Sequence, residues 1–260
     1  MTQDWRSLKS PTTFLHSQFS NNRDLGLIAQ LELWNTTRAV FEQFGADIES
    51  SAASEKLDAV ERLGQAYQDW HHTWCGVLGV DDLAGSIAKL YFNCALLYLY
   101  SHIYRGGNRS QELNTDTRLP ELHDRFRSSA HAVLRMFTNS GLRILDLPSY
   151  FGTMLAFASV AMIKVLRGCQ ILDDSRRDIM QLLRELTQSL RQIKLPSSSS
   201  HPYVGVARGL EQVAETMPGS TDQSAVASTD LDLNNSILMD DIWNLDFTDF
   251  GNNWMGFDEH

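Results

Sequence analysis

The sequence lacks the motifs on which most enzymatic, metal and nucleotide sites depend. Its three cysteines, Cys75, Cys94 and Cys169, lie far apart, and no pair has the CxxC spacing of a zinc cluster. No GxSxG, GxGxxG or GxxxxGK[ST] run occurs, so a nucleophile elbow or phosphate-binding loop has no support. The adjacent His71 and His72 would point about 100° apart on a helix, which is poor geometry for one metal ion. We therefore expect buried, reduced thiols and no catalytic site, metal or cofactor.

A long uninterrupted hydrophobic run is also missing. The most apolar segments, residues 90–104 and 150–166, are shorter than the ~20 residues that a bilayer-spanning helix requires. Polar residues such as Asn93 and Lys164 interrupt them. Residues 1–9 carry no apolar run of the kind found in secretory signals. We interpret both apolar segments as core helices and expect no membrane association.

Basic residues are absent from the last fifth of the chain, since none follows Arg208. Residues 218–260 contain nine of the 32 acidic residues, which leaves 23 acidic residues against all 22 basic ones in the rest of the chain. The net charge of −10 therefore belongs almost wholly to a C-terminal tail. A body without a net basic charge is not expected to bind nucleic acid directly, because phosphate contacts require a basic patch.

The apolar pattern predicts helices throughout, with no sustained alternation of the kind that indicates strands. In the first helix the repeat includes Leu27 and Leu31, with Asp24 as the expected N-cap and Gly45 as the expected stop. We predict an all-α fold, an irregular multi-helix bundle with a disordered acidic tail. The expected helices cover about 24–45, 54–78, 83–105, 120–139, 150–168, 175–194 and 203–216. The expected parts are a flexible arm (1–23), a helical regulatory domain (24–217) and the tail (218–260).

The predicted helix at 83–105 is apolar nearly all round, which places it at the centre of the bundle. Three of its tyrosines, Tyr91, Tyr98 and Tyr104, recur at helical spacing. Rings at such spacing usually belong to a core. Because buried tyrosine hydroxyls need hydrogen-bond partners, a polar-lined pocket for a small-metabolite effector is the alternative hypothesis.

The tail is the most distinctive segment, and residues 228–259 read STDLDLNNSILMDDIWNLDFTDFGNNWMGFDE. Acidic residues alternating with bulky apolar ones, without a base, are typical of disordered activation segments. Charge repulsion keeps the apolar side chains in water until a partner groove accepts them as a short amphipathic helix. The alternative is that the tail packs on its own body as a final helix. The expected partner-binding residues are Leu238, Ile242, Trp243, Leu245, Phe247 and Phe250.

Three passages of the body resemble the helical middle-homology region of fungal binuclear zinc-cluster transcription factors. They read LIAQLELWNTTRAVFEQFG (27–45), AKLYFNCALLYLYSHIYRG (88–106) and FGTMLAFASVAMIKVLR (151–167). The resemblance extends over roughly residues 25–260 and rests on the order of the helices and on their pattern of apolar and polar residues. It is nearest to the leucine-pathway and weak-acid-response regulators, whose chains also end in acidic-aromatic tails.

This resemblance implies a nuclear transcription regulator whose tail binds coactivator proteins and whose body responds to a metabolite. The DNA-reading element of the family, CxxCxxxKxxCD with further cysteines, is not present in this sequence. Direct DNA binding is therefore not carried over, and we expect DNA to be reached only indirectly or through a zinc-cluster segment that is missing from this sequence. A helical adaptor without an activation role is the main alternative, and an all-α enzyme a weaker one.

Overall fold

The structure is a computed structural model that describes residues 22–45, 53–79, 83–104, 116–139, 147–148, 150–168, 173–192, 203 and 206–210. Every regular element within these ranges is a helix, and they contain no strand. The predicted all-α fold class is confirmed for this part of the chain. Residues 1–21 and 218–260 lie outside the described residues, so the predicted flexible arm and acidic tail stay predictions.

The observed helices follow the predicted ones closely. Helix α6 agrees with its predicted range at both ends, and α3 and α5 each begin one residue earlier than predicted. The largest difference among these helices is at the end of the third one, where a 3-10 turn replaces the predicted end of the helix. The elements are α2 (Asn22–Phe44), α3 (Ala53–Leu78), α4 (Leu83–Ser101), η2 (His102–Tyr104), α5 (Leu119–Asn139), α6 (Tyr150–Gly168) and α7 (Asp173–Gln192).

Helix ends have identifiable local causes. Helix α2 stops at Phe44, one residue before Gly45, as expected. The prediction of Asp24 as the N-cap is wrong, because the helix begins at Asn22 and Asp24 lies in its first turn. There its carboxylate still complements the helix dipole. Helix α3 ends where Gly79 adopts a φ of 78°, a left-handed conformation that glycine reaches without a Cβ penalty.

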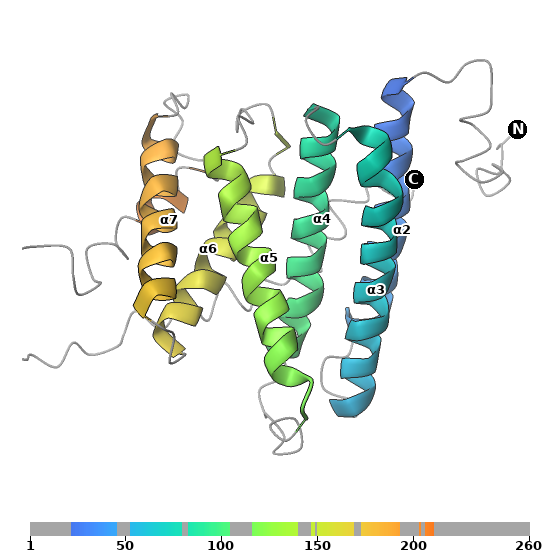
Figure 1. Cartoon of the computed structure of the whole chain (residues 1–260), viewed down its shortest axis with the longest axis horizontal. Coiled ribbons are helices and arrows are strands. Elements are labelled where there is room, and N and C mark those ends of the chain that lie inside the picture. The colour runs from blue at the N-terminus through green and yellow to red at the C-terminus, as the bar shows by residue number, and fades with distance from the viewer. Residues whose placement is uncertain are drawn as a thin grey trace, which may run out of the picture. The chain divides into compact units, whose positions relative to one another are not determined.

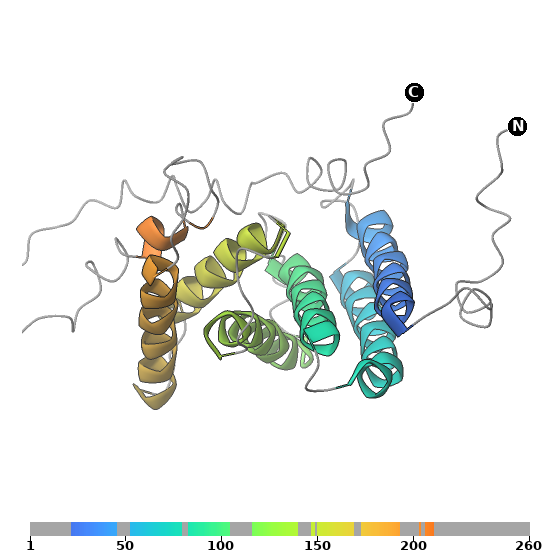
Figure 2. The ribbon, with the colours of Figure 1, turned by 90° about the horizontal axis from the view of Figure 1, so that it is seen from above.

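The described residues group into two compact units, Met1–Leu147 and Pro148–His260. In the first, α4 contacts α2, α3 and α5, so the helix that is apolar nearly all round lies at the centre as predicted. Seen from above, α4 lies between α5 and the α2–α3 pair (Figure 2). Figure 1 shows α2, α3, α4 and α5 running side by side along most of their lengths. By length and composition alone, α4 is also the one helix in the described part that could cross a bilayer, and half of its apolar window is buried.

The core of the first unit is aliphatic and aromatic, with Leu33, Tyr67, Leu97 and Leu134 almost fully buried. The sequence pattern was wrong for two residues of α2. Leu27 and Leu31 are 54% and 38% exposed, because they lie on the side of α2 opposite Ile28, Ala29 and Leu33.

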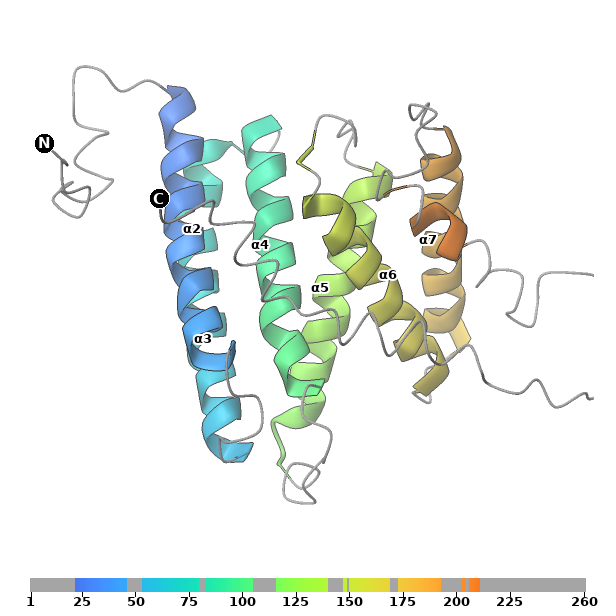
Figure 3. The same ribbon diagram turned by 180° about the vertical axis from the view of Figure 1, so that it is seen from behind.

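The second unit contains α6 and α7, followed by a helical turn at residues 206–210 beside α7 (Figure 3). Helix α6 buries most of its length, including Phe151, Leu155 and Ala158. Helix α7 is amphipathic, and its apolar face buries Ile179, Leu182, Leu183, Leu186 and Leu190. Arg176 of α7 donates a hydrogen bond of 2.9 Å to the Leu166 carbonyl near the end of α6, which satisfies a C-terminal helix acceptor.

Candidate functional site

Of the three tyrosines predicted to line a pocket, Tyr91 lies in the contact between α4 and α2, and Tyr98 packs on the turn that follows α4. Tyr91 is half-buried, and burial raises the pKa of its hydroxyl while a hydrogen bond to Gln30 of α2 lowers it. The ring of Tyr98 packs edge-on against His102, with 4.9 Å between ring centroids. The side chain of Tyr104 lies outside the described residues. These contacts are those of packed interhelical residues, and the effector pocket stays a prediction.

The end of α4 forms an aromatic cluster with the end of α2. His102 is 1% exposed and stacks on Phe44 of α2, with ring centroids 4.7 Å apart. Together with Tyr98, these rings fix the end of α2 against the end of α4. The sequence pattern singled out Tyr98, but it did not predict a buried histidine beside it.

Aromatic side chains of α3 also donate hydrogen bonds into α2. The indole Nε1 of Trp70 donates to the Ala29 carbonyl (2.8 Å), and that of Trp74 donates to Oε2 of Glu32 (2.7 Å). One turn before Trp70 on α3, the Tyr67 hydroxyl donates to Oγ1 of Thr37 on α2 (2.9 Å). Burial of large side chains with their polar atoms paired makes the α2–α3 contact specific in register.

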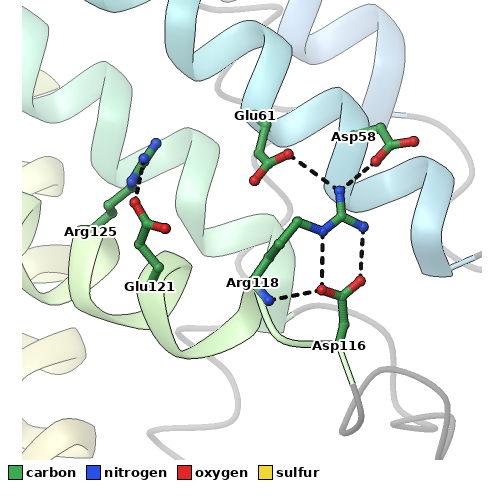
Figure 4. A network of polar contacts seen from close by, with 6 residues as sticks. All are labelled: Asp58, Glu61, Asp116, Arg118, Glu121 and Arg125. Atoms are coloured by element: carbon green, nitrogen blue, oxygen red, sulfur yellow. Dashed lines mark hydrogen bonds and ion pairs between the residues drawn. The ribbon is translucent and has the colours of Figure 1, made fainter.

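A polar network joins α3 to the start of α5 around one guanidinium group (Figure 4). Asp116 accepts two hydrogen bonds from the Arg118 side chain, at 3.0 and 2.8 Å, and one from the Arg118 backbone N–H at 2.9 Å. Nη1 of the same guanidinium contacts Asp58 and Glu61 of α3. Beside it, Arg125 pairs with Glu121 on α5 at 2.6 Å.

The electrostatics of this network favour its charged form. The hydrogen bonds from Arg118 lower the pKa of Asp116 to about 2, and the same bonds raise the pKa of Arg118. Three carboxylates converge, a feature that an all-α enzyme would use around a substrate. Here they surround the guanidinium of Arg118, which links α3 to the start of α5. Sequence reasoning missed it because Asp58 and Arg118 are 60 residues apart.

Of the two adjacent histidines, His71 lies in a contact between helices and His72 lies on the surface of α3. His71 packs its ring on Phe92 of α4, 4.2 Å between centroids, and burial lowers its pKa. His72 is exposed. Among the residues that the structure describes, no group of three His, Cys, Asp or Glu side chains is placed to hold a metal ion.

The thiols follow the prediction only in part. Cys94 is fully buried and unpaired with another cysteine, and burial raises its pKa. Cys75 was also expected to be buried, but it is only half-buried near the end of α3. Cys169 lies outside the described residues. So do all six residues of the expected partner-binding segment, from Leu238 to Phe250.

The exposed face of α7 carries charge in a pattern that sequence reasoning did not single out. Arg177, Arg184 and Arg191 recur every seven residues and are all exposed. A spacing of seven places them on one line along a helix. The seven-residue recurrence of arginine is a signal in the sequence from which this line could have been predicted.

Comparisons of the chain with models of protein families, with characterised proteins and with solved structures gave no match.

Proposed function

We propose that the protein is a nuclear regulator of transcription, in which a helical body carries an acidic-aromatic segment that binds coactivator proteins. The pattern of residues 228–259 supports this proposal: eight acidic residues, no basic residue, and bulky apolar side chains between the acids. Segments of this composition remain in water and bind through a short amphipathic helix. DNA is reached through another protein or segment, since the sequence contains no zinc-cluster motif.

The experiment is a fusion of residues 218–260 to an unrelated DNA-binding domain, assayed with a reporter gene. The fusion is expected to activate the reporter. Replacing Trp243 and Phe247 by Ala is expected to reduce activation more than replacing Asp222 by Asn, because apolar anchors fill a partner groove while a distant charge acts weakly. A well-expressed fusion that leaves the reporter silent would exclude the proposal.

The adaptor hypothesis makes a different prediction for the same residues. If the tail only completes the helical body, backbone amides in residues 237–250 are protected from hydrogen exchange in the isolated protein. An activation segment that folds on a partner leaves them rapidly exchanging until the partner is added. Hydrogen exchange on the full chain, with and without a coactivator domain, separates the two.

A further inference from the structure

The outer face of α2 carries an apolar line that the described helices leave partly exposed. Leu27 and Leu31 are 54% and 38% exposed, and the half-buried Trp34 follows at a step of three residues. Steps of four and three residues keep side chains on one side of a helix. Single exposed leucines are common on protein surfaces, but a line of apolar residues opposite a buried face is typical of a helix that packs on both sides.

The apolar line faces away from α3. Ala29 is 1% exposed and its carbonyl oxygen accepts the hydrogen bond from Trp70, so it marks the side of α2 that faces α3. Leu27 and Leu31 each lie two residues from Ala29. At 100° per residue, a step of two places side chains about 160° apart. Helices α3 and α4 pack on α2, and neither covers these two leucines.

The residues that precede α2 are within reach of the apolar line. They end at Asn22, the first residue of α2. At 1.5 Å per residue, Leu27 lies about 8 Å and Leu31 about 14 Å along the helix from that point. Leu15 is seven residues before Asn22, a separation that can span about 23 Å. The covalent connection also holds the preceding residues near α2 at an effective concentration on the order of millimolar.

The composition of these residues matches an apolar surface. Residues 10–21, which we call the N-terminal segment, read SPTTFLHSQFSN and contain no Asp, Glu, Lys or Arg. A serine followed by a proline is typical of a helix start, and Leu15 and Phe19 are spaced to share one helix face with Phe14 beside them.

The acidic segment 228–259 fits the same surface less well. It would bring eight acidic residues to a helix that already carries three acidic residues against two basic ones. Burial of a carboxylate without a partner is costly, whereas burial of the uncharged N-terminal segment is not opposed by charge. Position along the chain and composition therefore both favour the N-terminal segment as the occupant of the apolar line.

We propose that the N-terminal segment folds back along α2 as a short amphipathic helix, whose Leu15 and Phe19 cover Leu27 and Leu31. Two antiparallel helices can be joined by a loop of two to five residues, and the polar residues 20–22 provide such a loop. The proposal differs from the flexible arm that composition predicts, and it does not depend on the activity of the acidic segment.

The turn also determines which residues meet. Leu15 and Leu27 are each six residues from Asn21, so a turn centred there places them opposite one another. The contact adds a helix to the first unit on the side of α2 that faces away from α3, and it converts an exposed apolar line into a buried one.

The test measures backbone amide hydrogen exchange of residues 13–19 in the full chain, with a synthetic peptide of residues 1–21 as the undocked reference. In the unmodified chain these amides are expected to exchange about tenfold more slowly than in the peptide, or slower still. L27D/L31D is expected to remove most of this protection. The matched control is V77D, because Val77 is 53% exposed but lies on α3, and it should leave the protection unchanged. Unchanged exchange in α4 shows that the first unit stays folded in each variant.

A charge pair provides a second arm of the test. L15D should lose the protection, and L15D/L27K should recover it to about threefold above the peptide, because an exposed ion pair is weak. L15D/V77K should not recover it. Amides of residues 13–19 that exchange as fast in the unmodified chain as in the peptide would show a flexible arm and overturn the proposal. An equal response to L27D/L31D and V77D would overturn it as well.

The same samples identify the other two occupants. Sedimentation velocity that shows a dimer which L27D/L31D dissociates, with the exchange of residues 13–19 unchanged, would assign the apolar line to a second copy of the chain. Loss of protection in residues 237–250 of L27D/L31D, with residues 13–19 unchanged, would assign it to the acidic segment. Either result would overturn the proposal.

Discussion

Replacing Gly85 by Ala should destabilise the first unit, although the residue lies inside a helix where alanine is normally preferred. Gly85 is in the first turn of α4 and is buried. A Cβ at this position would lie 1.8 Å from the carbonyl oxygen of Gly79 and 3.0 Å from its carbonyl carbon. The obstructing atoms are backbone, at the point where Gly79 ends α3 with a φ of 78°. No side-chain rotation can relieve the clash.

The magnitude follows from two opposing terms. Gly to Ala inside a helix stabilises by about 0.5–1 kcal/mol through backbone entropy. Forcing a methyl group into filled space typically costs about 1–3 kcal/mol, and a backbone obstacle favours the upper end. The expected net loss for Gly85→Ala is therefore about 2 kcal/mol. Gly76 provides the matched control, because a Cβ there meets nothing within 4 Å. Gly76→Ala should stabilise by up to about 1 kcal/mol.

The assay is urea unfolding of both variants, followed by circular dichroism and by tryptophan fluorescence. The two variants should differ by about 3 kcal/mol, or about 6–12 °C in melting temperature for a chain of this size. Trp70 and Trp74 on α3 make fluorescence a probe of the same junction. Equal stability of the two alanine variants would refute the reasoning, since it would mean that the α3–α4 turn opens at no cost.

Other contacts give further expectations. Arg118→Gln should lower stability at pH 7. The pKa of Asp116 in the folded chain is about 2, below its value in the unfolded chain. The stabilisation of the fold by the Asp116–Arg118 pair is therefore fully present above about pH 4 and is lost as the pH falls toward 2. The difference between variant and unmodified chain should therefore shrink as pH falls from 5 to 2 in urea titrations. Trp74→Phe removes the indole donor to Glu32 and should cost about 1–3 kcal/mol in the same unfolding assay. In a chain whose other cysteines are replaced by serine, Cys94 should react with a thiol reagent only as fast as the protein unfolds, because it is fully buried.

Periodicity predicted the helices of this fold well, since most of them bury one face and glycines stand at the ends of α2, α3 and α6. Helix α6 was placed residue for residue, and the central position of α4 followed from its apolar composition. Periodicity did not predict which apolar residues remain exposed to solvent. Leu27 and Leu31 fit the repeat but lie away from the core, because the helices that pack on α2 cover only part of its circumference.

Contacts between segments that are far apart in the chain could not be predicted from the sequence. The Arg118 network depends on α3 and the turn before α5 meeting in space, and neither segment contains a motif that indicates the other. The indole of Trp74 could be predicted to need an acceptor, but the choice of Glu32 depends on the register of α3 against α2. The expected activation residues of the tail can be judged only by the fusion assay.

Net charge proves to be a poor guide to what each face of a helix can bind. Helix α7 has four basic and four acidic residues, so its net charge is zero. Three of its arginines, Arg177, Arg184 and Arg191, share one line, but Asp174 stands one turn before the first of them, and Asp178 and Glu185 lie along a neighbouring line. The balanced charge of the whole body therefore does not exclude nucleic-acid binding at every helix face. On α7 the carboxylates of Asp178 and Glu185, which lie beside the arginines, determine the potential that a phosphate group would meet there.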